Sequence, residues 1–244
     1  MTKNPSPREP ALGPASDLGL WLGGYRPEES TDNTDGTAIL VPRRRPVQRR
    51  SRERFARILA AAREVLLESG IESFTFDAVA RRADVPIGTL YQFFANKYAL
   101  ICELDRADSS AVTEEMRGFL EETPSAQWPR VVEELIDRMA RLWRTDPSRR
   151  AVWHAVQSTP ATRTTTMANQ MPVVALVAHA VAPLSPGASD TERGRLAGFL
   201  IHAGISMLNL AVQNLPRDED KFDDTVEETK RMLISYLFLV AQDG

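Results

Sequence analysis

Residues 74–97 read FTFDAVARRADVPIGTLYQFFANK, and this stretch decides the fold of the N-terminal part of the chain. Thr75 is suited to cap a short helix, and Asp77 in the first turn is favoured by the helix dipole. Pro86 is suited to the first turn of a second helix that ends near residue 95, because its fixed φ is already helical. Two short helices joined by a tight turn are typical of a helix-turn-helix, which places its second helix in the major groove of DNA.

The helical wheel of the second helix separates a core side from a reading side. Leu90 and Phe94 fall together with Ile87 on the side predicted to face the neighbouring helices. The opposite side carries Gly88, Tyr91, Gln92 and Ala95. Gly88 would allow close approach of the backbone to DNA, Tyr91 would contact a thymine methyl group or a phosphate, and Gln92 would pair with adenine. The alternative is that Tyr91 and Phe93 are core aromatics of a helical bundle.

A longer helix is predicted just upstream, over residues 52–68, because apolar side chains recur there at spacings of three and four. Ser51 is its expected N-cap and Gly70 its stop. Residues 43–50 form a basic arm that we expect to be flexible, in which Arg49 and Arg50 are candidate DNA contacts; a solvated linker is the alternative. Residues 1–42 are rich in proline and show no helical or strand period, which predicts a disordered tail.

The distribution of charge supports a polyanionic partner for the middle segment alone. Residues 1–42 hold 3 basic and 6 acidic side chains, residues 43–97 hold 12 and 6, and residues 98–244 hold 15 and 21. The middle segment therefore carries +6 within a chain whose net charge is −3. Phosphate would attract this segment and be repelled by the acidic remainder.

In residues 74–80 and 85–97 the sequence resembles the DNA-binding domain of the TetR family of repressors. The resemblance covers about residues 51–100, and it includes the Gly-Thr-Leu-Tyr run, the aromatic pair and the Asn-Lys that opens the next helix. It implies a three-helix DNA-binding domain over residues 51–97. It also implies a helical domain over residues 98–244 that binds a small effector, and a homodimer.

The resemblance also implies roles for individual residues. Thr75 and Lys97 would hold phosphates, Lys97 acting together with the first amides of the following helix. The residues that would face the groove are Gly88, Thr89, Tyr91 and Gln92.

Three residues depart from the family pattern. Asp84 stands where glycine is frequent at the turn, and aspartate tolerates a left-handed conformation. Ile87 stands where a polar or basic residue is common. The contact that remains available to its side chain is with a thymine methyl group. Phe93 stands where histidine or tyrosine often reaches a phosphate, so one hydrogen bond is expected to be missing. The arginines of residues 43–52 would replace that lost affinity.

The remainder of the chain is predicted to be helical, so the expected fold is all-α. No segment alternates with the period of two that a half-buried strand requires. Short connections rich in proline and glycine separate the helices, as in helix-on-helix packing. The expected helices are 98–121, 126–144, 147–157, 171–181, 191–214 and 220–241.

The last two predicted helices carry strong apolar stripes. Residues 232–240 are apolar on nearly all faces apart from Ser235, which favours a helix shared between the core and a partner. We therefore expect a homodimer through these helices, as the resemblance also implies. Twofold symmetry would place two recognition helices in successive major grooves about 34–36 Å apart, on a palindromic operator of double-stranded DNA.

The effector pocket is the weakest signal in the sequence. Trp143, Trp153, His154 and Gln157 combine apolar surface with a few polar groups, and they are the candidate effector-binding residues. Residues 158–170 are rich in threonine and are expected to form a mobile stretch that gates entry. Core packing explains the two tryptophans equally well. The effector itself is unidentified.

Other classes of function find no support in the sequence. The chain has one cysteine, Cys102, which excludes an internal disulfide and fits a cytoplasmic protein. The histidines are too dispersed for a metal site, no catalytic motif is present, and no metal or cofactor is expected. The longest uninterrupted apolar stretches are about as long as residues 232–240, too short to span a membrane.

The leading hypothesis is thus a ligand-responsive repressor that a small effector releases from its operator. One alternative is an architectural DNA-binding protein that uses the arginine arm and has no effector. Another is an all-α enzyme.

Overall fold

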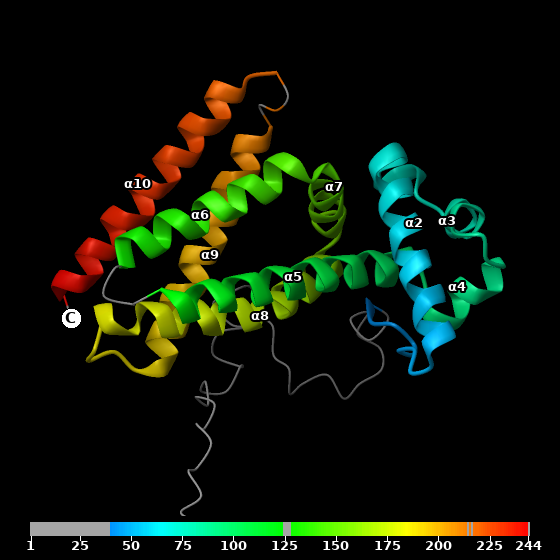
Figure 1. The fold of residues 1–244 in the computed structure, drawn as a ribbon, viewed down its shortest axis with the longest axis horizontal. Coiled ribbons are helices and arrows are strands. Elements are labelled where there is room, and N and C mark those ends of the chain that lie inside the picture. Colours follow the sequence, from blue (N-terminus) through cyan, green and yellow to red (C-terminus); the bar gives the residue numbers. More distant parts are fainter. Residues whose placement is uncertain (1–39, 124–127, 214, 216, 244) are drawn as a thin grey trace, which may run out of the picture.

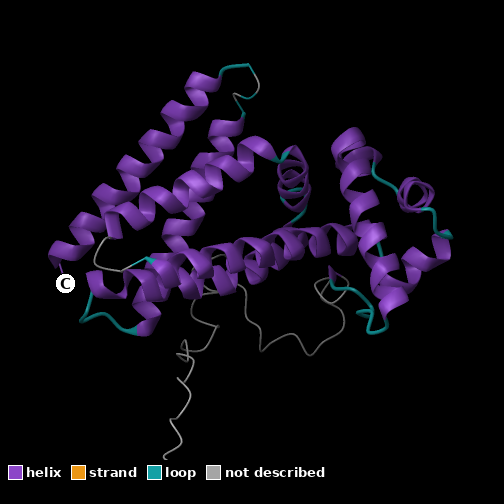
Figure 2. Ribbon diagram, in the orientation of Figure 1, coloured by secondary structure: helices purple, strands orange, loops and turns teal. Residues whose placement is uncertain are grey.

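The computed structural model describes residues 40–123, 128–213, 215 and 217–243, and its regular structure is helical throughout these residues (Figure 2). The predicted all-α fold is confirmed. Of the predicted tail over residues 1–42, all but residues 40–42 lie outside the described part of the chain.

The helices form an N-terminal group at one end of the molecule and a larger C-terminal group at the other (Figure 1). The N-terminal group consists of α2 (Arg49–Ser73), α3 (Phe76–Ala83) and α4 (Ile87–Phe93). The C-terminal group consists of α5 (Lys97–Glu122), α6 (Trp128–Thr145), α7 (Pro147–Val156), α8 (Pro160–Val181), the 3-10 turn η3 (Ala182–Leu184), α9 (Asp190–Val212) and α10 (Glu219–Asp243). The long helix α5 extends from the N-terminal group along α8.

Local capping in the N-terminal group follows the sequence closely. The Thr75 side chain accepts a hydrogen bond from the Ala78 amide at 3.2 Å, as predicted for the cap of α3. Asp84 adopts the left-handed conformation at φ 51°, and Gly70 has φ 68° where the regular part of α2 ends. The predicted N-cap of α2 was wrong: the helix begins at Arg49 with Gln48 in the cap position, so Ser51 lies inside it.

Aromatic packing holds the N-terminal group together. The centroid of the Phe55 ring on α2 lies 5.1 Å from the centroid of the Phe93 ring and 5.4 Å from that of the Phe94 ring. Helix α7 adds Val152 and Val156 to the same core, although it follows α6 in the chain. The DNA-binding unit implied by the sequence therefore shares its core with a helix from the C-terminal group.

The C-terminal group has a second core, made by α5, α6, α8, α9 and α10. Here the predicted mobile stretch over residues 158–170 was wrong, because α8 begins at Pro160. Thr159 and Thr162 form a reciprocal capping box at its start. The hydroxyls of Thr164 and Thr165 donate to carbonyls one turn earlier, so threonines that indicate a loop in the sequence are accommodated within a helix.

Two of these helices satisfy a length and hydropathy criterion for spanning a membrane, namely residues 160–184 and α9. The count of uninterrupted apolar residues in the sequence did not identify these two helices. One or two such helices are weak evidence for a membrane protein, since the core helices of a soluble protein pass the same test. Both helices supply side chains to the second core, including Val174 and Ala197.

Candidate functional site

The recognition face of α4, as we define it, comprises Ile87, Gly88, Tyr91 and Gln92, which are all exposed at the end of the molecule. Ile87 is 42% exposed and Tyr91 48% exposed. The Tyr91 ring makes an edge contact with Phe76 on α3, 5.0 Å between centroids, which orients the ring and leaves its other side to solvent. The wheel had placed Ile87 on the core side, and this was wrong. The first residue of α4 projects beyond its neighbours instead.

Gly88 is not required by the packing of the chain itself. A Cβ atom built at this position meets no described atom within 4 Å. Because Gly88 has no side chain, the recognition face does not protrude at this position. An approaching DNA backbone or base edge would need that space.

Two predicted DNA contacts, Thr89 and Phe93, lie on the other side of α4. Thr89 is 8% exposed and Phe93 is 1% exposed. Phe93 follows Leu90 by three residues and so shares its core side. Both side chains are buried against the core, so the prediction that they contact DNA directly was wrong.

The predicted phosphate contacts Thr75 and Lys97 are partly engaged within the chain. The Thr75 oxygen caps α3 and keeps its own O–H for another partner. Lys97 donates from Nζ to the Ile71 carbonyl at 2.9 Å, which leaves two further N–H donors on the ammonium group. Asn96 caps α5 by accepting from the Ala99 amide at 2.9 Å, so that amide is not free for the predicted anion site.

The start of the basic arm is docked rather than flexible. The Arg43 amide donates to the Phe93 carbonyl at 2.7 Å, and its guanidinium donates to the Tyr91 carbonyl at 3.1 Å. Arg45 makes two hydrogen bonds of 3.0 Å to the carboxylate of Glu103 on α5, whose side chain is 1% exposed. The Arg43 contacts bind the arm to the C-terminal end of α4, because that end has carbonyls without helical partners, and the Arg45 contacts bind it to α5.

The rest of the arm continues into α2 at the surface. Arg49 pairs with Glu53 at 2.8 Å, with both side chains largely exposed, and Arg50 is exposed on the same first turn. An exposed pair of this kind is weak and exchanges readily for a phosphate contact.

Comparison with known proteins shows two matching families that together cover the DNA-binding and C-terminal regions. Residues 58–104 match the bacterial regulatory proteins of the tetR family, and residues 126–241 match the tetracyclin repressor-like C-terminal domain. The chain belongs to the TetR family of transcriptional regulators.

Curated relatives match this TetR-family chain over less than a third of its length. The HTH-type transcriptional repressor KstR of Rhodococcus jostii is 40% identical over 75 residues, which cover 29% of this chain and 35% of KstR. KstR of Mycolicibacterium smegmatis is 41% identical over 63 residues, which cover 24% and 31%. The match thus spans about a third of the length of these relatives.

Solved structures share the fold over most of the chain. FadR from Bacillus subtilis, solved in complex with stearoyl-CoA, gives a TM-score of 0.62 at 17% identity, with 74% of this chain and 98% of FadR covered. A TetR-family regulator from Streptomyces coelicolor gives a TM-score of 0.56 at 24% identity, with 77% and 97% covered.

The C-terminal domain of this TetR-family chain contains an apolar cavity of about 120 Å³ between α5, α6, α8, α9 and α10, which we call the apolar chamber. Its wall includes Met116, Trp128, Ile136, Val177 and Leu233. A second cavity of about 70 Å³, the polar chamber, lies next to it. The two have four lining residues in common: Val112, Met139, Val173 and Ile205.

The four candidate effector residues fall in different places. Trp143 and Trp153 both line the polar chamber, and Trp143 is buried with its Nε1 donating to Asn209 Oδ1 at 3.0 Å. Gln157 lines an outer recess that also includes Trp153. His154 is exposed on α7 and does not line either chamber. The structure therefore places the two tryptophans in the lining of the polar chamber, whereas Gln157 and His154 lie outside that lining but next to Trp153, whose ring centroid is 5.2 Å from that of His154.

Sequence reasoning missed the charged residues of the polar chamber. Asp105 on α5 is 7% exposed, and its Oδ2 accepts a hydrogen bond from Asn169 Nδ2 at 2.7 Å. Burial raises the pKa of Asp105 to about 6. The sequence could have indicated that Asp105 is buried, because it follows the apolar Ile101 by four residues and so lies on the same face of α5.

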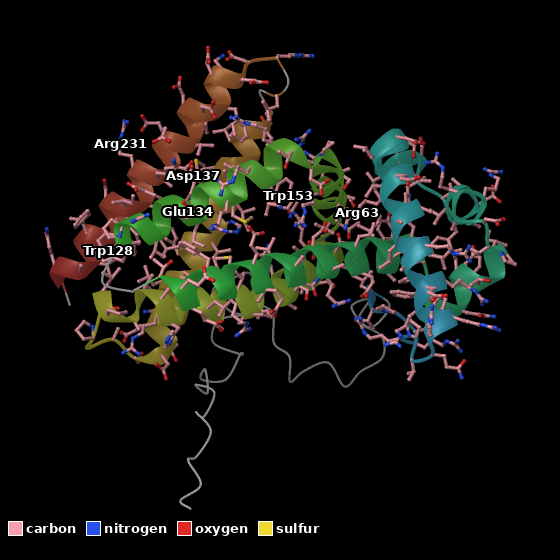
Figure 3. All side chains as sticks on the ribbon, in the orientation of Figure 1. Arg63, Trp128, Glu134, Asp137, Trp153 and Arg231 are labelled. Atoms are coloured by element: carbon pink, nitrogen blue, oxygen red, sulfur yellow. The ribbon has the colours of Figure 1, made fainter. Side chains whose placement is uncertain are left out.

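Two arginines approach the same chamber. Arg63 on α2 makes two hydrogen bonds of 2.6 and 3.0 Å to the carboxylate of Asp108, which lines the chamber. In Figure 3, Arg63 lies on the DNA-binding unit and Trp153 on α7. Arg149 also lines the chamber; its Nε donates to Asp146, whereas its buried Nη1 has no hydrogen-bond partner among the described residues.

Proposed function

We propose that this chain is a cytoplasmic, dimeric transcriptional repressor that binds a palindromic operator and leaves it when a small effector binds. The recognition face of α4 carries this proposal. It exposes an aliphatic side chain, a glycine, a tyrosine and an amide on a short helix at the end of the molecule. These groups suit contact with thymine methyl groups, phosphates and adenine edges in the major groove.

Dimerisation through the last two helices is supported by apolar side chains left exposed there. They are Phe199 and Leu210 on α9 and Met232, Tyr236, Phe238 and Leu239 on α10. Met232, Tyr236 and Leu239 follow one another at spacings of four and three, so they share one side of α10. A twofold axis at this surface would present two copies of α4 to successive major grooves.

Effector control is supported by the two chambers in the C-terminal domain. The structural relative FadR was solved with stearoyl-CoA, which is a property of that protein and suggests that this fold can enclose an elongated ligand. An effector that binds one conformation of the dimer better than the other would shift the population away from the DNA-bound form.

Selection of bound duplexes from a random DNA library tests the proposal most directly. The purified protein is incubated with the library at near-physiological salt, and the enriched pool is sequenced. We expect an inverted repeat with half-sites about one helical turn apart. Retention of DNA at low salt without sequence enrichment would overturn the proposal and favour an architectural DNA-binding protein.

Substitution of Tyr91 tests the recognition face. Tyr91→Ala is expected to weaken binding to the selected operator about 10- to 100-fold, which corresponds to about 1–3 kcal/mol, while the dimer mass and melting temperature stay near wild type. Tyr91→Phe keeps the ring against Phe76 and separates the role of the hydroxyl. Measurements are fluorescence anisotropy on labelled operator and size-exclusion chromatography with light scattering. Loss of the fold in Tyr91→Ala would show that Tyr91 is a core residue.

A further inference from the structure

We propose that the effector site takes an uncharged, elongated apolar molecule that carries a hydroxyl group at one end. The apolar body occupies the apolar chamber, and the hydroxyl lies in the polar chamber between Arg149 and Asp105. This inference rests on the proposed function, since it names the chemical class of the effector.

The apolar chamber determines the body of the ligand. Its described lining consists of glycine and apolar side chains drawn from five helices. A polar group placed here would lose its hydrogen bonds to water and find none in exchange. Met116 and Met139 lie in the wall, and their unbranched side chains adapt to ligands of different shape.

The adjacency of the two chambers indicates the shape of the ligand. A cavity of about 150 Å³ holds a molecule the size of benzene, so each chamber alone accepts only a short piece of a ligand. Val112, Met139, Val173 and Ile205 border both chambers, so a ligand that displaces these side chains extends from one chamber into the other. The site therefore favours a long, narrow molecule.

The polar chamber determines which end group the ligand carries. The buried Nη1 of Arg149 is a donor without a partner among the described residues, and the carboxylate of Asp105 is a buried acceptor. A hydroxyl oxygen accepts from the first and its proton is donated to the second. A ligand hydroxyl would thus satisfy both groups at once.

The charges around this chamber disfavour an anionic end group. Helix α5 contributes Asp105 and Asp108, α7 contributes Arg149 with Asp146 at its N-cap, and α2 contributes Arg63. The chamber lining thus holds two carboxylates and one guanidinium group, and Arg63 and Asp146 pair with two of these from outside the lining. The Asp108 and Asp146 carboxylates already bind an arginine each, which leaves Asp105 to repel a ligand carboxylate.

The outer recess adjoins the polar chamber on a side that suits this orientation. It shares Trp153, Gln170 and Ile205 with the polar chamber. A molecule entering from the recess with its apolar end first passes the polar chamber and ends in the apolar chamber. Its hydroxyl end then remains on the solvent side.

The test compares hexan-1-ol with hexanoate, which share a chain of the same length and differ in the end group. Each is titrated into the purified full-length protein at pH 8 and followed by tryptophan fluorescence and calorimetry. Trp143 and Trp153 border the polar chamber and Trp128 the apolar chamber, so the fluorescence responds to occupancy. We expect the alcohol to bind at least tenfold more tightly than the carboxylate. Equal or tighter binding of hexanoate, or no binding of the alcohol, would overturn the proposal.

Variants assign the preference to the two groups. Asp105→Asn is expected to reduce the ratio of the two affinities to about threefold or less, because the repelling charge is removed. Arg149→Met is expected to weaken hexan-1-ol binding about tenfold. Arg195→Met removes an exposed arginine of α9 that lines neither chamber, and it serves as the matched control with unchanged affinity.

Two further measurements separate the possible failures. Melting temperature and operator binding check that each variant is folded, and the wild-type comparison of alcohol with carboxylate decides the proposal even if Arg149→Met does not fold. Unchanged alcohol binding in a folded Arg149→Met variant would overturn the proposed end-group contact. Failure of the proposed function is seen separately, as the absence of an inverted repeat in the DNA selection.

Discussion

At the scale of single residues, Asp105 shows how burial couples protonation to stability. Its pKa of about 6 exceeds the ordinary value of 3.8 because the carboxylate is buried, although the hydrogen bond from Asn169 partly opposes this. The folded state therefore binds the proton more tightly than the unfolded state. The stability contributed by the protonated form is present in full below about pH 4 and is lost as pH rises through about 6.

We therefore predict that Asp105→Asn stabilises the protein at pH 7–8, by about 1–3 kcal/mol. The advantage is expected to shrink as pH falls from 6 to 4, because the wild-type carboxyl becomes neutral there. The measurement is urea unfolding of both proteins at a series of pH values. Asp224→Asn, which removes an exposed carboxylate on α10, is the control. A difference that is the same at every pH, or a destabilised Asp105→Asn at pH 8, would contradict this account.

At the scale of helices, the Arg63–Asp108 pair connects α2 of the DNA-binding unit with the wall of the polar chamber. Its side chains are 25% and 19% exposed, so solvent screens the pair only in part. Arg63 also reaches Ser148 Oγ on α7 at 3.5 Å. Because α7 packs in the core of the N-terminal group, this arginine joins three helices around one chamber.

We predict a coupling energy of about 1–3 kcal/mol between Arg63 and Asp108 in a double-mutant cycle built from Arg63→Met and Asp108→Asn, measured by urea unfolding. The comparison pair is Arg82–Glu68, which has hydrogen bonds of 3.0 and 2.6 Å but is more exposed. Its coupling is expected to be smaller because solvent screens it. Couplings of equal size would show that the buried pair has no special role in joining α2 to α5.

At the scale of the whole molecule, the exposed apolar side of α10 is the feature that a single chain leaves unexplained. Leu239 is 59% exposed and Met232 is 44% exposed, next to Tyr236 on the same side. An exposed surface of this kind indicates contact with a partner, and the twofold arrangement proposed above would cover it.

We predict that Leu239→Glu converts the dimer to a monomer at micromolar concentration and lowers affinity for a palindromic operator at least 100-fold, because each half-site is then bound alone. Light scattering after size-exclusion chromatography gives the mass. Lys221→Glu places the same side chain on an exposed position at the start of α10 and should leave the mass unchanged. A dimeric Leu239→Glu variant that keeps its operator affinity would place the interface elsewhere.

Features that depend on neighbours in the sequence could be predicted well. The cap at Thr75, the left-handed Asp84 and the break at Gly70 each follow from a local conformational preference. The exposed positions of Tyr91 and Gln92 followed from helical periodicity. Periodicity was less reliable at the start of so short a helix, where Ile87 lay on the side opposite to the one inferred for it. Phe93, a candidate DNA contact through the family resemblance alone, lay in the core.

The sequence by itself thus determined an all-α chain, the TetR-type helix-turn-helix and the apolar stripes of the last helices, because these depend on spacing along one helix. Only the tertiary structure decided that Arg43 and Arg45 dock on α4 and α5, and that Asp105, Asp108 and Arg149 surround one chamber. Those groups come from segments far apart in the chain. Burial and charge pairing between them depend on how the helices pack together, and local sequence patterns carry no record of that packing.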